Sequence, residues 1–435
     1  MQTLPRIADI DAWVLDGTIK GYPGHAAPRP LGAIREAGWN VLDGDLPLPV
    51  AVLKASALAH NRDWMRRFLA ATGATLAPHG KTTMSPQLFA AQLEDGAFGI
   101  TCATVGQLQV YRRHGIRRVF MANQVIGAQG VEYVVGELAR DPGFEIYLIV
   151  DSLPGIEQLA TAAVRAGLAR PLRVLIEVGT PGGRTGVRSI AEVARLVAAI
   201  EAAAPALALH GVEAYEEVVQ GDAAQAEAAI HALLALQLAA STLARRGAAA
   251  RGAEPWLLSA GGSVYFDLVA AGLAAAGGEG ATVLLRSGCY LSHDHVRYAK
   301  AEVARNARSP ALVALGEGLR PALEVWGTLQ SRPEPTRAYV SAGKRDLSHD
   351  LDLPVATGWC RPGSGRVVRP LDAAHRIFKL NDQHAHLEVP ADSPLAVGDL
   401  VRIGISHPCT TFDRWQLVYV VDDDYTVVDA IRTFF

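Results

Sequence analysis

The feature that most constrains the fold is a regular alternation of short apolar runs with amphipathic segments between residues 48 and about 290. Strands that alternate with helices in this way indicate parallel βα units. About eight such units over roughly 240 residues predict a (β/α)8 barrel of the TIM type. An open doubly wound sheet is the alternative, but no GxGxxG follows the first strand. The chain is therefore expected to be an α/β protein.

The predicted strands of this series are short, and two of the helices between them end at Gly96 and Gly115. The strands cover residues 49–54, 75–77, 99–103, 119–122, 145–150, 173–178, 207–213, 256–259 and 283–286. The alanine-rich segment from 223 to about 246 is interpreted as a long outer helix.

After about residue 305 the pattern changes to short β-rich segments separated by Gly, Pro and Asp turns. This pattern predicts an all-β domain of Greek-key or barrel type. The Gly/Pro-rich N-terminal stretch is expected to be an arm that joins this domain. Three parts follow, with boundaries at 1–45 for the arm, 46–304 for the barrel and 305–435 for the β-domain.

Composition narrows the classes of function. Half of the 435 residues are hydrophobic and the formal charge is -3, without a basic stripe. Neither nucleic acid nor an anionic membrane is therefore an expected partner. The four cysteines are far apart and form no CxxC pair, and the N-terminus lacks the pattern of a signal peptide. A reducing cytoplasm is the expected location.

One lysine lies at a strand end that faces a barrel mouth. Lys81 closes the segment Pro-His-Gly-Lys after the predicted strand 75–77, and Ser85-Pro86 opens the next helix. The positive end of that helix, together with His79, is expected to favour the unprotonated amine. Lys81 is therefore a candidate Schiff-base nucleophile. Spacing alone also allows a solvated lysine or a structural cap.

Two glycine-rich stretches follow the last two predicted barrel strands. Small residues at such strand ends let backbone N–H groups converge on an anion, and this is a common phosphate site of barrels. Ordinary turns are the alternative. The residues concerned are Ser259, Gly261, Gly262 and Ser263 in the first stretch, and Gly288, Cys289 and Tyr290 in the second.

A third glycine-rich loop, residues 179–186, contains Arg184, which is a candidate partner for a phenolate or carboxylate in the barrel mouth.

In the C-terminal part, His407 and Cys409 lie two positions apart in a segment expected to be strand-like, so that their side chains point the same way. Imidazole and thiolate are zinc ligands. Two ligands are too few for a closed structural site, which favours a catalytic metal. His384 is a possible third imidazole.

Seven motifs in one order resemble the D-serine dehydratase and D-threonine aldolase family, which comprises metal-activated pyridoxal-phosphate enzymes. The resemblance covers roughly residues 45 to 425. The motifs are Pro78-His79-Gly80-Lys81-Thr82, Thr101-Cys102-Ala103-Thr104, Ala122-Asn123-Gln124-Val125, Gly183-Arg184-Thr185-Gly186-Val187, Ser341-Ala342-Gly343-Lys344, Asp382-Gln383-His384 and His407-Pro408-Cys409.

The resemblance implies the fold of alanine racemase, known as fold type III of pyridoxal-phosphate enzymes, and it implies roles for the residues. Lys81 would carry pyridoxal 5'-phosphate as an imine, and His407 and Cys409 would bind Zn2+ or another divalent metal. The two glycine-rich stretches would hold the phosphate. His79, Arg184, Tyr215 and Tyr290 would surround the cofactor. One departure is that the family's Tyr-x-Gly reads Tyr215-Glu216-Glu217 here.

The function implied by this resemblance is a D-serine or D-3-hydroxy amino acid ammonia-lyase, which eliminates the β-hydroxyl and gives a keto acid and ammonia. A D-threonine aldolase, which yields glycine and an aldehyde, uses the same groups. An amino-acid racemase and a non-enzymatic pyridoxal-phosphate-binding protein are further alternatives. The fold implies a homodimer, and the expected ligand is a small D-amino acid.

Overall fold

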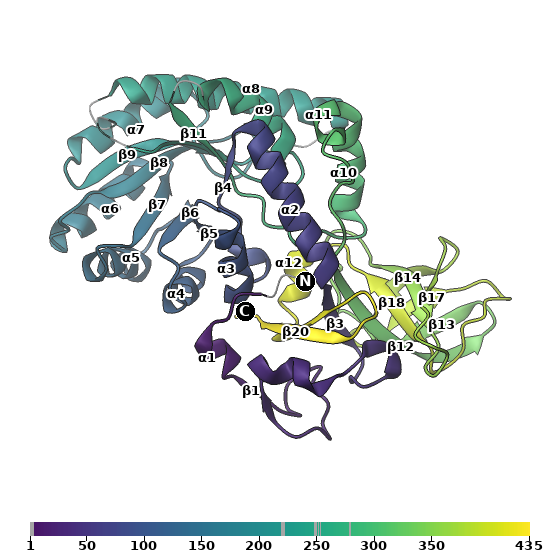
Figure 1. Cartoon of the computed structure of the whole chain (residues 1–435). Coiled ribbons are helices and arrows are strands. Elements are labelled where there is room, and N and C mark those ends of the chain that lie inside the picture. The colour runs from purple at the N-terminus through teal and green to yellow at the C-terminus, as the bar shows by residue number, and fades with distance from the viewer. Residues whose placement is uncertain (1–3, 219–221, 248–249, 251, 253, 278–279) are drawn as a thin grey trace. The chain divides into compact units, whose positions relative to one another are not determined.

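The computed structural model describes residues 4–218, 222–247, 250, 252, 254–277 and 280–435 (Figure 1). The chain forms two compact units. We name the first the barrel unit, made of residues 67–81 and 93–288. The second is the sheet unit, made of residues up to 66, 82–92 and 289–435.

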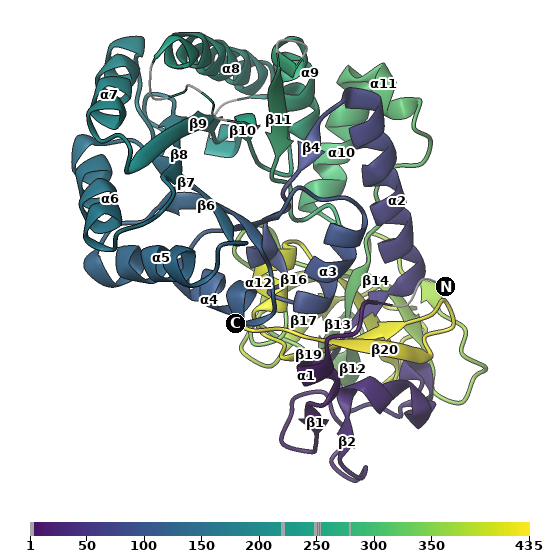
Figure 2. The same ribbon diagram turned by 60° about the vertical axis from the view of Figure 1, so that its left-hand side comes forward.

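The barrel unit contains an eight-stranded parallel sheet in the order β4-β11-β10-β9-β8-β7-β6-β5. An isolated parallel bridge between His79 and Thr101 joins the two ends of the sheet. The strands therefore curl around a common centre (Figure 2). Their bounds are β4 Thr75–Leu76, β5 Ile100–Cys102, β6 Arg118–Gln124, β7 Glu145–Val150, β8 Leu172–Val178, β9 Leu207–Ala214, β10 Trp256–Ala260 and β11 Ala281–Leu285.

Six helices of the barrel unit connect the consecutive strands from β5 to β11 and lie outside the sheet (Figure 2). Several begin at a side chain that caps the first turn, which satisfies a backbone N–H that has no helical acceptor. The capping residues are Thr104, Ser152, Ser189 and Asp222. The helices are α4 Val105–Arg113, α5 Ala128–Arg140, α6 Leu153–Arg165, α7 Ile190–Ala202, α8 Ala223–Arg246 and α9 Phe266–Gly277.

Side chains fill the inside of the barrel. A buried cluster brings together apolar residues from neighbouring strands, namely Ala77, Phe120, Tyr147, Ile149, Leu175, Leu257 and Leu284. Among the described residues, α8 is the single helix long and apolar enough to cross a membrane by length and composition. In the barrel unit, buried residues of α8 include Ile230 and Leu234, and Gln237 donates a hydrogen bond to Val212 O of β9.

The sheet unit contains a mostly antiparallel ten-stranded sheet. Its main path is β15-β14-β18-β12-β13-β17-β16, and β3, β19 and β20 extend it from β12 (Figure 1). The bounds are β3 Val50–Lys54, β12 Leu323–Glu334, β13 Arg337–Val340, β14 Val355–Cys360, β15 Arg369–Pro370, β16 Arg376–Leu380, β17 Ala385–Glu388, β18 Leu400–Gly404, β19 Leu417–Val421 and β20 Val427–Arg432.

The remaining elements are short, apart from α2, which has residues in both units. They are α1 Ala8–Asp11, the hairpin strands β1 Val14–Leu15 and β2 Arg29–Pro30, α2 Ala55–Thr72, α3 Pro86–Glu94, α10 Arg297–Arg308, α11 Pro310–Val313 and α12 Pro408–Phe412. The 3-10 turns of the described residues include η1 Leu31–Ala37, η2 Val41–Asp43, η3 Gly80–Thr82 and η4 Glu216–Val218.

The predicted fold class, a (β/α)8 barrel with an all-β domain, is confirmed, but the placement of its first strand was wrong. Val50–Lys54 pairs antiparallel with β12 and parallel with β19, so it belongs to the ten-stranded sheet. The barrel strands are therefore β4 to β11. The N-terminal residues contribute Leu15, Leu31 and Val41 to the same hydrophobic core as Trp326 and Tyr419 of this sheet.

Candidate active site

The segment that carries Lys81 is held by backbone hydrogen bonds at the end of β4. The N–H of Ala77 donates to Leu285 O at 2.8 Å, and the N–H of His79 donates to Arg286 O at 3.1 Å. Lys81 follows in the turn η3 and is half-buried. The lysine therefore lies at the carboxyl end of a barrel strand, where (β/α)8 enzymes collect their reactive groups.

The imidazole of His79 lies in a cationic environment within the barrel unit. Burial lowers the pKa of His79 well below its usual range, and the charges of Lys81, Arg286 and Arg184 lower it further. Its Nδ1 is buried without a hydrogen-bond partner. His79 is therefore a neutral imidazole at physiological pH, and three positive charges act on this part of the barrel.

Arg286, whose charge acts on His79, belongs to a buried ion pair. The Arg286 guanidinium lies 2.8 Å from the Glu213 carboxylate, and both side chains are 2% exposed. Arg286 also donates hydrogen bonds to Ser259 Oγ at 2.5 Å and to Ala214 O at 3.1 Å. Burial raises the pKa of Glu213, and the charge of Arg286 opposes this shift and favours the carboxylate. Neither Arg286 nor Glu213 was predicted to be a site residue.

The two glycine-rich stretches predicted at neighbouring strand ends do meet. Strands β10 and β11 pair in parallel, and the hydroxyl of Ser287 donates to the carbonyl of Gly262 at 2.6 Å. Gly261 directly follows β10, and Gly288 follows Ser287 after β11. Ser259 lies inside β10, where its hydroxyl donates to Leu284 O at 2.9 Å.

Three consecutive backbone N–H groups in the first stretch converge on carboxylate oxygens. The N–H of Gly262 donates to Glu216 Oε1 at 2.7 Å, and the N–H groups of Ser263 and Val264 both donate to Glu217 Oε1. We call these three N–H groups the anion cradle. The cradle fits an anionic oxygen group, because two carboxylates of the chain itself occupy it.

Tyr215 and Arg184 lie next to this cradle. The Arg184 guanidinium carbon lies 4.7 Å from the centre of the Tyr215 ring, and the Tyr215 hydroxyl donates to Glu217 Oε2 at 3.2 Å. Burial raises the pKa of Tyr215, as do Glu217 and Glu216, so the phenol is neutral. Arg184 is exposed. The structure therefore brings the predicted residues Arg184, Tyr215 and Ser263 into one network.

In the sheet unit, the predicted metal pair lies at the start of a helix. His407 is the N-cap of α12 and Cys409 is inside its first turn, with Pro408 at the first helical position. The expectation of a strand-like segment was therefore wrong. The two side chains still interact: burial lowers the pKa of His407, but hydrogen bonding to Cys409 and Asp350 raises it to about 9.

The pair His407 and Cys409 is in contact with Asp350, Cys289 and Thr82. His407 Nδ1 lies 2.7 Å from Asp350 Oδ2. The sulfur of Cys409 lies 3.7 Å from that of Cys289 and 3.4 Å from the hydroxyl oxygen of Thr82. Hydrogen bonding to Cys289 lowers the pKa of Cys409 well below its usual range, and His407 lowers it further, while burial opposes both effects. A thiolate is the form that binds metals.

The donor set is small. Across the part of the chain that the structure describes, no group of three or more His, Cys, Asp or Glu side chains is placed to hold a metal ion. His384 therefore does not complete a three-residue set with His407 and Cys409. Tyr290, predicted beside the cofactor, accepts a hydrogen bond from Gln92 at 3.2 Å within the sheet unit.

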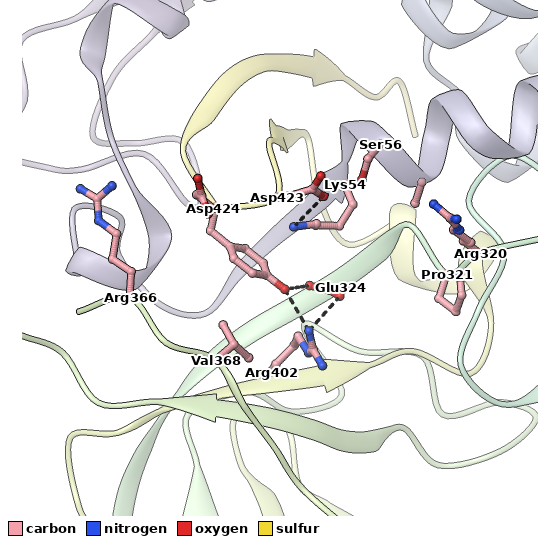
Figure 3. Close-up of a pocket in the computed structure, with 12 residues that line it drawn as sticks. Lys54, Ser56, Arg320, Pro321, Glu324, Arg366, Val368, Arg402, Asp423 and Asp424 are labelled. Atoms are coloured by element: carbon pink, nitrogen blue, oxygen red, sulfur yellow. Dashed lines mark hydrogen bonds and ion pairs between the residues drawn. The ribbon is translucent and has the colours of Figure 1, made fainter. Parts of the chain in front are cut away.

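The sheet unit also contains a polar pocket of about 340 Å³, which was not predicted from the sequence (Figure 3). Lys54, Arg320, Arg366 and Arg402 are its basic lining residues. Their charges are matched locally: for example, Lys54 lies 3.6 Å from Asp423, and Arg402 lies 3.9 Å from Glu324. The pocket thus presents paired charges to solvent.

Models of known protein families match residues in both units. Residues 53–279, more than half of the chain, match the family described as alanine racemase, N-terminal domain, and residues 322–421 match a putative serine dehydratase domain. The chain therefore belongs to the alanine racemase N-terminal domain family, and it also carries a D-serine dehydratase-like domain. A D-threonine aldolase from Arthrobacter sp is 26% identical over 86% of this chain and 89% of its own length.

Solved structures of the family share the fold. The D-threonine aldolase from Filomicrobium marinum covers 89% of this chain and 95% of its own chain, with a TM-score of 0.72 and 24% identity. The D-threo-3-hydroxyaspartate dehydratase from Delftia sp. HT23 covers 91% and 99%, with a TM-score of 0.68 and 24% identity. Alanine variants of one histidine and one cysteine of that dehydratase are also known, the cysteine variant in a metal-free form.

Proposed function

We propose that this protein is a lyase that uses pyridoxal 5'-phosphate and a divalent metal to act on D-3-hydroxy amino acids. The observation that carries the proposal is the half-buried Lys81 at the end of β4, in the part of the barrel that Arg184 and Arg286 make cationic. The family resemblance implies both pyridoxal phosphate and a divalent metal, and the residues at the two positions fit these groups. Bound pyridoxal phosphate supplies an electron sink for negative charge at the substrate Cα.

Each residue then has a chemical task. The amine of Lys81 would hold the cofactor and, when released from it, would take the proton from the substrate Cα as a general base. The anion cradle at Gly262, Ser263 and Val264 would bind the phosphate. Arg184 and Tyr215 would position the anionic cofactor, and the neutral imidazole of His79 would pack against it without competing for the proton.

His407 and Cys409 would hold the divalent metal, for which zinc is our first choice because imidazole and thiolate suit it. Asp350 supports this assignment, since a carboxylate on one imidazole nitrogen orients the other nitrogen towards a metal. Thr82, which contacts the Cys409 thiol, directly follows Lys81 in the chain. A bound metal would act as a Lewis acid towards the β-hydroxyl of the substrate.

We propose D-serine as the first substrate, with elimination of the β-hydroxyl giving pyruvate and ammonia. The cysteine in the metal pair supports elimination, because it resembles the zinc-dependent dehydratases. Retro-aldol cleavage to glycine and an aldehyde is the second candidate. It is favoured by a D-threonine aldolase that is 26% identical over 86% of this chain.

Product analysis separates the two reactions. The purified protein, loaded with pyridoxal phosphate and zinc, is incubated with D-serine and with D-threonine. Pyruvate and ammonia from D-serine support the ammonia-lyase, whereas glycine and acetaldehyde from D-threonine support the aldolase. Lys81→Ala should abolish either activity, and the control Lys379→Ala, at an exposed lysine of β16, should keep it. Interconversion of D- and L-serine without either product would indicate a racemase instead.

We further propose a cytoplasmic homodimer. A reducing location is consistent with the four cysteines, none of which forms a disulfide in the part of the chain described. Light scattering on the purified protein tests the dimer, and a monomer at micromolar concentration would contradict it.

A further inference from the structure

The anion cradle after β10 is filled by the chain itself. One oxygen of Glu217 accepts hydrogen bonds from the N–H groups of both Ser263 and Val264, and Glu216 accepts one from Gly262. The side chain of Glu217 also lies directly against the Cα of Gly262, because an added Cβ at Gly262 would overlap the Glu217 carboxylate. A carboxylate therefore lies where the proposed function requires a phosphate.

These contacts cannot coexist with a phosphate in the same cradle. Each backbone N–H has one hydrogen to donate, and each is already directed at a carboxylate oxygen. A phosphate group placed beside two carboxylates would also be repelled by them. At least one of the two carboxylates therefore has to leave the cradle before a phosphate can bind. Glu217 is the one able to do so, because it is half-buried, whereas Glu216 is fully buried.

We propose that Glu217 is a built-in competitor for the phosphate of the cofactor and thereby sets the affinity of the protein for pyridoxal phosphate. The inference rests on the proposed function, because it assigns the cradle to the cofactor phosphate. Binding of the phosphate would move the Glu217 carboxylate out of the cradle, while the fully buried Glu216 stays in place. Glu217 is therefore a determinant of cofactor affinity, and it acts through the cradle.

The neighbouring residues give the displaced carboxylate a polar environment. Tyr215 already donates a hydrogen bond to the other Glu217 oxygen, and the Arg184 guanidinium lies over the Tyr215 ring. Arg184 is exposed and its charge is close to this network. The exchange would therefore replace a carboxylate by a phosphate at the N–H groups while the carboxylate keeps polar partners.

The test compares the affinities of three probes for the apoprotein. Glu217→Gln keeps an oxygen acceptor but removes the charge, and Glu217→Ala removes both. Both variants should bind pyridoxal phosphate and inorganic phosphate more tightly than the wild type, on the order of tenfold, because a competing anion is lost. Pyridoxal, which lacks the phosphate, should bind with unchanged affinity. Glu157→Gln, at an exposed position of α6, is the control with the same change of charge.

Equilibrium dialysis measures all three dissociation constants, and circular dichroism checks that each variant is folded. Unchanged or weaker phosphate binding in both Glu217 variants would overturn the proposal. An equal gain for pyridoxal would also overturn it, because the effect would then not act on the phosphate. Failure of the proposed function looks different: pyridoxal phosphate would produce no visible absorbance band that depends on Lys81, while the inorganic phosphate measurement would still decide the role of Glu217.

Discussion

His407 Nδ1 and Asp350 Oδ2 lie 2.7 Å apart, so a carboxylate fixes the orientation of the imidazole that we assign to the metal. Asp350 is in turn bonded to the hydroxyl of Thr410 at 2.6 Å. The arrangement commits Nδ1 to a carboxylate and leaves Nε2 for a metal, which is a common way to orient a histidine ligand.

Asp350→Asn should therefore weaken metal binding without removing a ligand. The expected loss of zinc affinity is about 10–100-fold, the usual range for such a partner. Competition with a chromophoric chelator measures it. Asp392→Asn, an exposed aspartate of the same unit, is the control and should leave the affinity unchanged. Equal affinities in wild type and Asp350→Asn would contradict the role of Asp350 in orienting a metal ligand.

Removing the arginine of the buried pair should destabilise the barrel unit. Arg286→Met leaves Glu213 buried without its partner, and breaking a buried pair in this way costs about 3–5 kcal/mol. Adding Glu213→Leu should recover much of the loss, because an apolar pair of similar size leaves no buried charge. Urea unfolding of the two variants and the wild type measures this. A double variant no more stable than Arg286→Met would contradict the prediction.

A glycine in β9 should not tolerate a side chain. Gly211 has φ of +152°, and a Cβ there would overlap the carbonyl of Leu257 in the paired strand β10. Gly211→Ala should therefore lower the unfolding free energy by at least about 2 kcal/mol. Gly136→Ala, inside α5 where no atom approaches the added Cβ, should instead raise it by about 0.5–1 kcal/mol. Thermal unfolding that ranks the two variants in the opposite order would contradict this placement.

A buried histidine should make the protein less stable in mild acid. Burial lowers the pKa of His210 to about 4, below the ordinary value of 6.5. The unfolded chain therefore binds the proton more readily, so stability is lost as the pH falls from about 6.5 to about 4. The loss is about 3 kcal/mol for this group. His210→Gln should flatten the dependence in urea unfolding, whereas the exposed control His231→Gln should match the wild type. Parallel curves for all three proteins would exclude His210 as the cause.

Local patterns predicted most elements but could not assign every strand to a sheet. Val50–Lys54 is an apolar run followed by a helix, which is the local signature of a barrel strand. Its pairing with β12 and β19 depends on residues more than 250 positions away. Strand β14 was not predicted, because Gly358 interrupts its apolar pattern and its pairing with β18 shifts register there.

The candidate site likewise combines residues that were predicted from the sequence with residues that only the structure reveals. Lys81 and the pair His407 and Cys409 carry motifs that the sequence displays directly. The partners Asp350 and Glu213 carry no motif, because only the folded chain brings them to His407 and Arg286. Glu217 was noticed as a departure from the family pattern, but its position in the cradle required the structure.

The central claim is that Lys81 is the residue that holds the cofactor. The purified protein is incubated with pyridoxal phosphate and reduced with borohydride, and its peptides are analysed by mass spectrometry. We predict a pyridoxyl phosphate group on Lys81 and none in Lys81→Ala. A label on another lysine, or no label at all, would contradict the account.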